Sequence, residues 1–434
     1  MNRNNWLLLK HGIVIDPSQG IEQEPMDILV EDGRISAIGH QIPPPGSADS
    51  GEILDLTGKW VVPGLIDIHV HLREPGQEYK ETIETGTRAA AAGGFTAVAS
   101  MPNTSPPNDS AEITRSILAR AKEKGSCRVY PVAAITKGQA GESLTEFGDL
   151  LDAGAIAFSD DGLPVSDAAV MRLAMEYSLN FHALIISHAE ELSLSRNGCM
   201  NLGNVSTRLG LRGIPAAAEE IAIFREIKLA ELTGARLHIA HVSTKGSIEI
   251  IRRAKEQGVR VTAESAPHYF TLTEEAVEGY NTFAKMNPPL RTEQDREAII
   301  QALADGTLDA IATDHAPHDI LEKECEFEAA ANGIIGLETA LPLTLELVEQ
   351  GAITPLRMVE LISTAPASII RQDGGSLKQG SPADITVIDP ETEYEITRDL
   401  FRSRSFNSPF LGRRVRGRAA LTICQGRITH QLCR

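Results

Sequence analysis

The sequence lacks the features of a membrane protein and of a secreted, disulfide-stabilised protein. Its 434 residues contain no run of 18 or more apolar residues, which argues against a spanning helix. The first residues carry only a short apolar run and no small-residue cleavage site, so we expect no signal peptide. The five cysteines are scattered and form no CxxC pair, which argues against disulfides and zinc fingers. We therefore expect a cytoplasmic protein with reduced thiols.

Positive charge is scarce. Lys and Arg number 41 against 59 Asp and Glu, which gives a formal net charge of −18. A chain this acidic is a poor partner for nucleic acid or an anionic membrane surface. We interpret the short basic run of Arg413, Arg414, Arg416 and Arg418 as a solvated face or a set of intramolecular ion pairs. Aromatic residues reach only 4%, but 42% hydrophobic and 23% charged residues exclude a mainly disordered chain.

Several well-known catalytic motifs are missing. The sequence has no GxSxG nucleophile elbow, no HExxH helix, no P-loop and no GxGxxG after a strand. These absences argue against a serine hydrolase of the elbow type, an HExxH metalloprotease, a P-loop NTPase and a dinucleotide-binding domain. The chemistry must therefore come from another arrangement of side chains.

The middle of the chain alternates between short apolar runs and helix-like segments. Eight strand candidates, from VVPGLIDIHVH to DAIATD, are each followed by a segment with helical periodicity, such as GSIEIIRRAKEQ. Eight such units with nearly continuous apolar strands predict an α/β fold, a (β/α)8 barrel of the TIM type. An open, doubly wound sheet is the structural alternative, because the pattern alone does not show closure.

The two ends of the chain have a different character. Residues 5–60 and 376–434 hold short alternating segments and turns with no long helix, which is typical of small β-structure. We predict that the ends pair as one small β domain beside the barrel. The predicted organisation is residues 1–61 and 376–434 in the β domain and residues 62–375 in the barrel.

Polar residues gather where the first barrel strand ends. Asp67, His69, His71 and Arg73 alternate there, and residues two apart in a strand point to the same side. Catalytic residues of such barrels come from the carboxyl ends of the strands. Two neighbouring imidazoles at that position can bind one divalent metal ion.

Four other strands also end in His or Asp. The fourth closes with Asp160 and Asp161, the fifth with His188, the sixth with His241 and the eighth with Asp314. Without a partner, these groups would be costly to desolvate together, so we predict a binuclear metal site rather than a buried polar network without metal. Asp160 and Asp161 lie on opposite faces of an extended chain, and alternation does not say which one faces the metals.

Other histidines receive simpler interpretations. His182 lies near the start of the fifth strand, at the opposite mouth of the barrel. His238, three residues before His241, is expected to point outward toward the helices. His268 and His315 lie near the catalytic mouth without a ligand position, where they could orient the ligands.

These motifs together resemble those of dihydroorotases, within the metal-dependent amidohydrolase superfamily. DIHVHLREPG is similar to their first-strand signature, and ATDHAPHDILEK, which ends in Lys323, is similar to the second. Further similar segments, in the same order as in the family, are MPNTSPP, MNPPLR, NGIIGLET, GSPADITVID and SFNSPFLGRRVRG.

The resemblance implies a set of metal ligands. His69, His71 and Asp314 fall on the first metal, and His188 and His241 on the second. Asp161 falls at the bridging position, where many relatives carry a carboxylated lysine, so the chain resembles the type I variant with an aspartate bridge. The implied cofactor is Zn²⁺, two ions per subunit, bridged by Asp161 and a hydroxide.

The resemblance also implies substrate contacts and an activity. Asp314 would be the general acid and base in the reversible cyclisation of N-carbamoyl-L-aspartate to L-dihydroorotate, a step of de novo pyrimidine (UMP) biosynthesis. Arg73 would bind the substrate carboxylate, although an ion pair with Asp67 or Glu74 is the alternative. The implied substrate-binding residues are His71, Arg73, Asn103, Asn287, His318, Asn332 and Gly333.

Two departures from the family pattern and two alternative functions remain in view. Asn332 stands where Phe is frequent, so its contact is expected through the backbone. SAPHYF replaces the usual TPHH and is similar to allantoinases and hydantoinases. A related cyclic amidohydrolase is therefore one alternative, and an inactive scaffold partner of aspartate transcarbamoylase is the other. The partners expected for an active enzyme are a small-molecule substrate, further copies of the chain in a homo-oligomer, and aspartate transcarbamoylase as a candidate.

Overall fold

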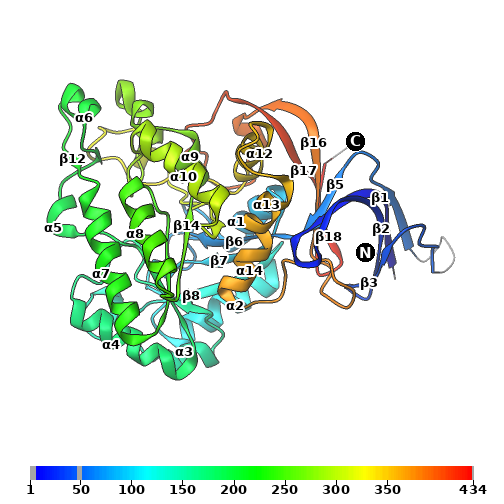
Figure 1. Cartoon of the computed structure of the whole chain (residues 1–434), viewed down its shortest axis with the longest axis horizontal. Coiled ribbons are helices and arrows are strands. Elements are labelled where there is room, and N and C mark those ends of the chain that lie inside the picture. Colours follow the sequence, from blue (N-terminus) through cyan, green and yellow to red (C-terminus); the bar gives the residue numbers. More distant parts are fainter. Residues whose placement is uncertain (1–5, 46–50, 433–434) are drawn as a thin grey trace.

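The computed structural model describes residues 6–45 and 51–432. It contains a barrel of parallel strands with a separate β-sheet beside it (Figure 1). The barrel sheet has eight strands in the order β15-β14-β13-β10-β9-β8-β7-β6. Their bounds are β6 (Leu65–Val70), β7 (Phe95–Ser100), β8 (Arg128–Ala133), β9 (Ala157–Phe158), β10 (Leu184–Ser187), β13 (Arg236–Ile239), β14 (Val261–Ser265) and β15 (Ala310–Ile311).

The first and last barrel strands meet where they end. A parallel bridge joins Val70, the last residue of β6, to His315, which follows β15. The His71 amide donates to the His315 carbonyl at 2.9 Å. The sheet is thereby nearly closed, so the predicted barrel is confirmed rather than the open sheet, and the ends of β6 and β15 lie side by side.

Helices surround the barrel, and their sequences explain where they begin and end. Thr244 caps α8 by accepting from the Ser247 amide, and Gly234 ends α7 in the left-handed conformation that glycine adopts readily. The main outer helices are α1 (Ile83–Ala92), α2 (Ala111–Lys124), α3 (Phe147–Asp152), α4 (Ala168–Ser178), α7 (Ala217–Thr233), α8 (Lys245–Glu256), α10 (Glu293–Asp305) and α12 (Ala340–Glu349).

Short elements fill the loops at the ends of the barrel. The longest excursion lies between β10 and α7, where β11 and β12 pair in parallel. These elements are α5 (Leu192–Ser195), β11 (Met200–Asn201), α6 (Asn204–Leu209), β12 (Gly213–Ile214), α9 (Pro267–Thr271), α11 (Ile320–Lys323), α13 (Pro355–Val359) and α14 (Ala365–Ile370).

The second sheet combines both ends of the chain, as predicted. The antiparallel pairing of β16 with β5 joins them, with Val387 opposite Val61. The predicted border between residues 61 and 62 falls inside β5, and the domain limits remain a prediction. The strands of this sheet are β1 (Trp6–Asp16), β2 (Ile21–Glu31), β3 (Arg34–Gly39), β4 (Gly51–Asp55), β5 (Trp60–Pro63), β16 (Ile385–Glu395), β17 (Arg414–Cys424) and β18 (Arg427–Gln431).

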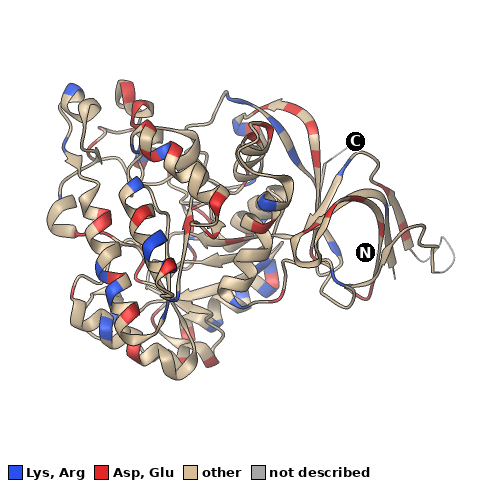
Figure 2. Cartoon of the chain, in the orientation of Figure 1, with Lys and Arg blue, Asp and Glu red and all other residues tan. Residues whose placement is uncertain are grey.

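Surface charges are mixed rather than segregated (Figure 2). In the basic run at the start of β17, Arg413, just before the strand, pairs with Glu346 at 2.7 Å, and Arg416 pairs with Glu349 and Glu391, as expected for intramolecular ion pairs. The described cysteines are all free thiols. Among the described residues, no helix has the length and apolar character needed to cross a membrane.

Candidate metal centre and active site

Asp161 lies at the centre of a buried cluster of imidazoles at the carboxyl end of the barrel. Its Oδ1 is 3.3 Å from His69 Nε2 and 3.6 Å from both His188 Nδ1 and His241 Nε2. Its Oδ2 is 3.6 Å from His71 Nε2. These five residues come from the carboxyl ends of four barrel strands: His69 and His71 lie at the end of β6, Asp161 follows β9, His188 follows β10 and His241 follows β13.

Two groups of potential metal ligands share this aspartate. His69, His71 and Asp161 form one group, and Asp161, His188 and His241 form the other, with the ligand atoms of each group within 4.8 Å of one another. All five side chains are buried. Asp161 thus has one pair of histidines on each side. Two cations that share one carboxylate ligand require this arrangement.

Asp314 completes the first group. Its Oδ1 lies 3.1 Å from His71 Nε2 and 3.6 Å from His69 Nε2. Asp314, His241 and Arg73 all have left-handed backbones, with φ of 49°, 36° and 61°. Non-glycine residues pay for this conformation, and such strain concentrates at functional sites.

The cluster leaves buried polar atoms without hydrogen-bond partners in the described structure. These atoms include His69 Nε2 and Asp161 Oδ1, which face each other. Buried polar atoms are otherwise almost always paired. Burial opposes the charge on Asp161, but His69, His188 and His241 hold its pKa well below the usual range. Converging imidazole nitrogens around an ionised carboxylate fit divalent cations.

The structure distinguishes the two adjacent aspartates. Asp160 turns away from the imidazoles, and its Oδ1 accepts from the Ile135 and Thr136 amides at 2.8 and 3.1 Å. The Thr136 hydroxyl donates to Oδ2. Burial raises the pKa of Asp160 to about 6. Asp160 thus holds the loop after β8, and Asp161 alone of the pair lies in the cluster.

Two predicted substrate-binding asparagines contact the cluster directly. Asn103 Oδ1 lies 2.8 Å from His71 Nδ1, and Asn103 Nδ2 is 3.4 Å from Asp161 Oδ2. Asn287 Nδ2 donates to Glu190 at 3.1 Å, and Glu190 is 3.2 Å from His188 Nε2. Both amides therefore lie against the candidate metal ligands.

Arg73 and His318 form the other side of the site. Arg73 Nε donates to the Pro317 carbonyl at 3.2 Å, and Nη2 is 3.4 Å from His318 Nε2. His318 Nε2 donates to the Asn332 carbonyl at 2.7 Å, so the contact between these two residues is made by the Asn332 backbone. Gly333 follows with φ of 115°, a conformation that favours glycine.

No carboxylate pairs with Arg73 within the described part of the chain. Glu74 instead pairs with Arg120 at 3.0 Å, and Asp67 accepts from the His69 and Thr313 amides. The ion-pair alternative for Arg73 is therefore wrong. A guanidinium that is only 8% exposed and lacks a carboxylate partner is available for an anionic ligand.

Comparison with known proteins gives the family. The family model "Dihydro-orotase-like" matches residues 58–247. The chain is 58% identical to a dihydroorotase of Syntrophotalea carbinolica over 98% of this chain and 99% of that protein. It is 56% identical to a dihydroorotase of Geobacter metallireducens over the same shares of the two chains. The chain belongs to the dihydroorotase family.

Solved structures similar to this dihydroorotase-family chain include hydantoinases. The L-hydantoinase (dihydropyrimidinase) from Arthrobacter aurescens superposes with a TM-score of 0.87 at 25% identity, covering 98% of this chain and 96% of the other. The D-hydantoinase from Thermus sp. gives a TM-score of 0.84 at 26% identity over 99% and 97%. The predicted barrel with an attached sheet is thus the fold of these amidohydrolases.

Glu264 is a buried carboxylate of the site that was not expected from the sequence of this member of the family. Glu264 Oε1 lies 3.0 Å from His69 Nδ1, and Oε2 lies 3.1 Å from His238 Nε2. The outward orientation expected for His238 is wrong, because its ring is buried against Glu264 and Thr262. The sequence did contain a sign of this residue: a glutamate stands within the short strand VTAES, which was expected to lie inside the barrel.

The two remaining histidines have different surroundings. His315 Nδ1 accepts from the Gly336 amide at 3.1 Å, and its Nε2 lies 3.5 Å from Glu81, so it holds the loop after β15. His268 is buried, and its Nε2 has no hydrogen-bond partner in the described structure. Burial lowers the pKa of His268 to about 4, which keeps this imidazole neutral.

Proposed function

We propose that the chain is an active dihydroorotase that interconverts N-carbamoyl-L-aspartate and L-dihydroorotate in pyrimidine biosynthesis. The observation that carries this proposal is the shared position of Asp161 between two histidine pairs, together with Arg73, which has no carboxylate partner among the described residues. An inactive scaffold would have no need to keep all six candidate ligands buried together. The family relationship supports the same activity.

The metal content is part of the proposal. We assign His69, His71 and Asp314 to one Zn²⁺ and His188 and His241 to a second, with Asp161 as the common ligand. Nitrogen and carboxylate ligands without a thiolate suit zinc. Two bound cations would lower the pKa of a water molecule between them and polarise a carbonyl oxygen.

Asp314 is the residue placed to move protons. Its pKa lies below the usual range because His71 and the neighbouring imidazoles outweigh its burial, so it is ionised before reaction. In hydrolysis of the ring it takes a proton from the attacking water and passes it to the leaving ring nitrogen. In ring closure it takes the proton from the carbamoyl nitrogen instead.

We propose that the substrate is bound and oriented by Arg73, Asn103 and His318. The guanidinium can bind the ring carboxylate with two parallel hydrogen bonds, which fixes the ring as well as its charge. Asn103 adds an amide beside His71, and the Asn332–Gly333 backbone closes the side where His318 lies. Asn287 borders the same space through Glu190.

The direct test compares a charged and an uncharged cyclic amide. The purified protein is assayed with L-dihydroorotate and with hydantoin, which has no exocyclic carboxylate. We expect kcat/KM to favour dihydroorotate by at least about 100-fold, since a bound carboxylate is worth roughly 3 kcal/mol at a buried guanidinium. A preference for hydantoin would support the hydantoinase-like alternative instead.

Location and assembly complete the proposal. The acidic composition and the free thiols support a cytoplasmic enzyme that binds neither nucleic acid nor a membrane surface. We also propose a homo-oligomer, with aspartate transcarbamoylase as a candidate partner. Light scattering of the pure protein, with and without added transcarbamoylase, tests both statements.

A further inference from the structure

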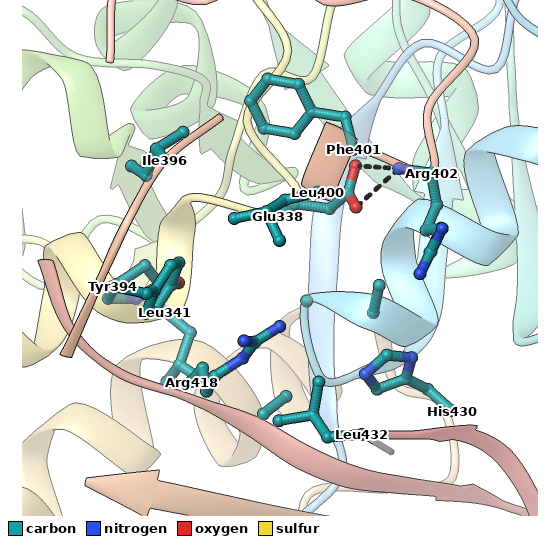
Figure 3. Close-up of a pocket in the computed structure, with 14 residues that line it drawn as sticks. Glu338, Leu341, Tyr394, Ile396, Leu400, Phe401, Arg402, Arg418, His430 and Leu432 are labelled. Carbon is teal, nitrogen blue, oxygen red and sulfur yellow. Dashed lines mark hydrogen bonds between the residues drawn. The ribbon is translucent and has the colours of Figure 1, made fainter. Parts of the chain in front are cut away.

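A small cavity lies between the barrel and the terminal sheet, apart from the candidate metal centre. It is bordered by α1 and α12 on the barrel side and by β16, β17, β18 and the segment after β16 on the other (Figure 3). None of the residues that line it is among the predicted site residues. Its volume is about 70 Å³. At about 10–15 Å³ for one water-sized probe, this space has room for part of a small organic ligand.

The cavity carries two guanidinium groups without carboxylate partners. Among the described residues, no Asp or Glu lies within ion-pair distance of Arg418 or Arg402, whereas Arg416 on the same strand as Arg418 is paired twice. Arg418 Nε is buried and has no hydrogen-bond partner in the described structure. Its guanidinium stacks 4.8 Å from the Tyr394 ring centroid and points toward the space between Glu338 and His430 (Figure 3).

The other polar groups of the cavity do not cancel this positive charge. The Glu338 carboxyl is engaged in hydrogen bonds with the backbone: it accepts from the Arg402 amide at 2.8 Å and from the Ser403 amide at 3.3 Å. Burial raises the pKa of Glu338 to about 8, so it is mostly uncharged at neutral pH. Burial and the two arginines lower the pKa of His430 to about 4. The neutral His430 has a buried Nε2 without a partner in the described residues.

The rest of the lining is apolar. Leu341, Ile396, Leu400, Phe401 and Leu432 surround the polar groups. A ligand for this cavity therefore needs one anionic end for Arg418 and an apolar body for these side chains.

We propose that this cavity is a second binding site, which takes a small organic monocarboxylate with its carboxylate on Arg418 and its apolar chain among the leucines and Phe401. The planar fork of Arg418 can give two parallel hydrogen bonds to a carboxylate, and His430 Nε2 can add a third contact. An occupant would touch both the barrel helices and the terminal sheet. It would therefore stabilise the packing of these two parts against unfolding.

The probe is butyrate, which has six non-hydrogen atoms, and its uncharged control is butyramide. Binding to the full chain is followed by saturation-transfer NMR, and the melting temperature is recorded in parallel. We expect saturable, millimolar butyrate binding that raises the melting temperature, with butyramide at least tenfold weaker. Arg418→Gln should weaken butyrate at least tenfold, while the matched variant Arg416→Gln should not, because Arg416 pairs with Glu349 and Glu391 and does not line the cavity.

Two further variants keep the test decisive. Arg402→Gln changes an exposed side chain whose own hydrogen bonds are made by its backbone, so it should fold and should also weaken butyrate. Arg73→Gln removes the carboxylate-binding guanidinium of the other site and should keep the butyrate binding that depends on Arg418. The proposal is overturned if butyrate binds Arg418→Gln and Arg402→Gln as tightly as the parent. Equal binding of butyramide, or loss of butyrate binding in Arg73→Gln, would overturn it as well.

Discussion

The Nδ1 atom of His69 lies 3.0 Å from Oε1 of Glu264, while Nε2 of the same imidazole faces Asp161. Glu264 thus fixes the ring so that one nitrogen is directed at the candidate metal centre. Burial would raise its pKa, but His238 and His69 lower the pKa of Glu264 to about 2. An ionised carboxylate on the far nitrogen of a histidine raises the basicity of the other nitrogen, which makes the imidazole a stronger metal ligand.

Glu264→Gln should therefore weaken zinc binding by about 10- to 100-fold, the usual effect of losing such a supporting carboxylate. The measurement is a competition titration with a zinc chelator. Glu226→Gln is the matched control, because Glu226 is equally buried but lies on α7 beside Arg225. Equal zinc affinity in the parent and in Glu264→Gln would remove Glu264 from this role.

Arg73→Lys should raise KM for dihydroorotate by about 10- to 100-fold, because lysine keeps the charge but loses the two-pronged donor. Zinc content should stay at the parent value, since Arg73 is not among the candidate ligands. Steady-state kinetics and metal analysis of the same preparation check both points. Parent-like kinetics would show that the substrate carboxylate binds elsewhere.

The adjacent aspartates should give opposite phenotypes. Asp161→Ala removes the common ligand, so we expect loss of at least one zinc ion and most of the activity. Asp160→Ala should keep both ions but lose about 1–3 kcal/mol of stability, because the Ile135 and Thr136 amides lose their acceptor. Metal analysis and urea unfolding separate the two effects. The reverse ranking in metal content would assign the bridge to Asp160.

Lys323 should make stability depend on pH. Its Nζ donates to the carbonyls of Ala331, Gly333 and Lys285, and burial lowers the pKa of Lys323 to about 7. Between this value and the ordinary pKa of about 10.4, the unfolded chain holds one more proton than the folded chain. The free energy of unfolding should therefore rise with pH across this window.

Lys323→Met removes that contribution and the hydrogen bonds to the three carbonyls. Urea midpoints of the parent and of Lys323→Met between pH 7 and pH 9 should diverge, with the parent gaining stability relative to the variant. KM should also increase in Lys323→Met, because the Asn332–Gly333 backbone loses its support. A stability difference that does not change with pH would rule out the lowered pKa.

Much of the candidate site could be predicted because it lies at the ends of strands. Apolar runs locate the strands, and the polar residues that follow them must meet at one mouth of a barrel, which brings together His69, His188, His241 and Asp314. The choice between the adjacent aspartates could not be predicted from alternation. The strand β9 ends at Phe158, so both aspartates lie beyond the strand, where its alternation no longer applies.

Other features depend on packing that no local pattern contains. The orientation of His238 is set by Glu264 on the neighbouring strand, not by its distance in sequence from His241. The cavity around Arg418 exists because β17 packs against α12, which precedes it by more than 60 residues. In the sequence, nothing distinguishes Arg418 from the other arginines of the basic run.

The central claim is that Asp161 is the permanent common ligand of two zinc ions that support hydrolysis of dihydroorotate. The most direct measurement is a zinc titration of metal-free protein in buffer depleted of carbon dioxide, with dihydroorotate turnover recorded at each step. A side-chain carboxylate, unlike a carboxylated lysine, needs no carbon dioxide. We predict that activity rises until two zinc ions are bound per subunit and that added bicarbonate changes nothing. Full activity at one zinc ion, or a requirement for bicarbonate, would contradict the account.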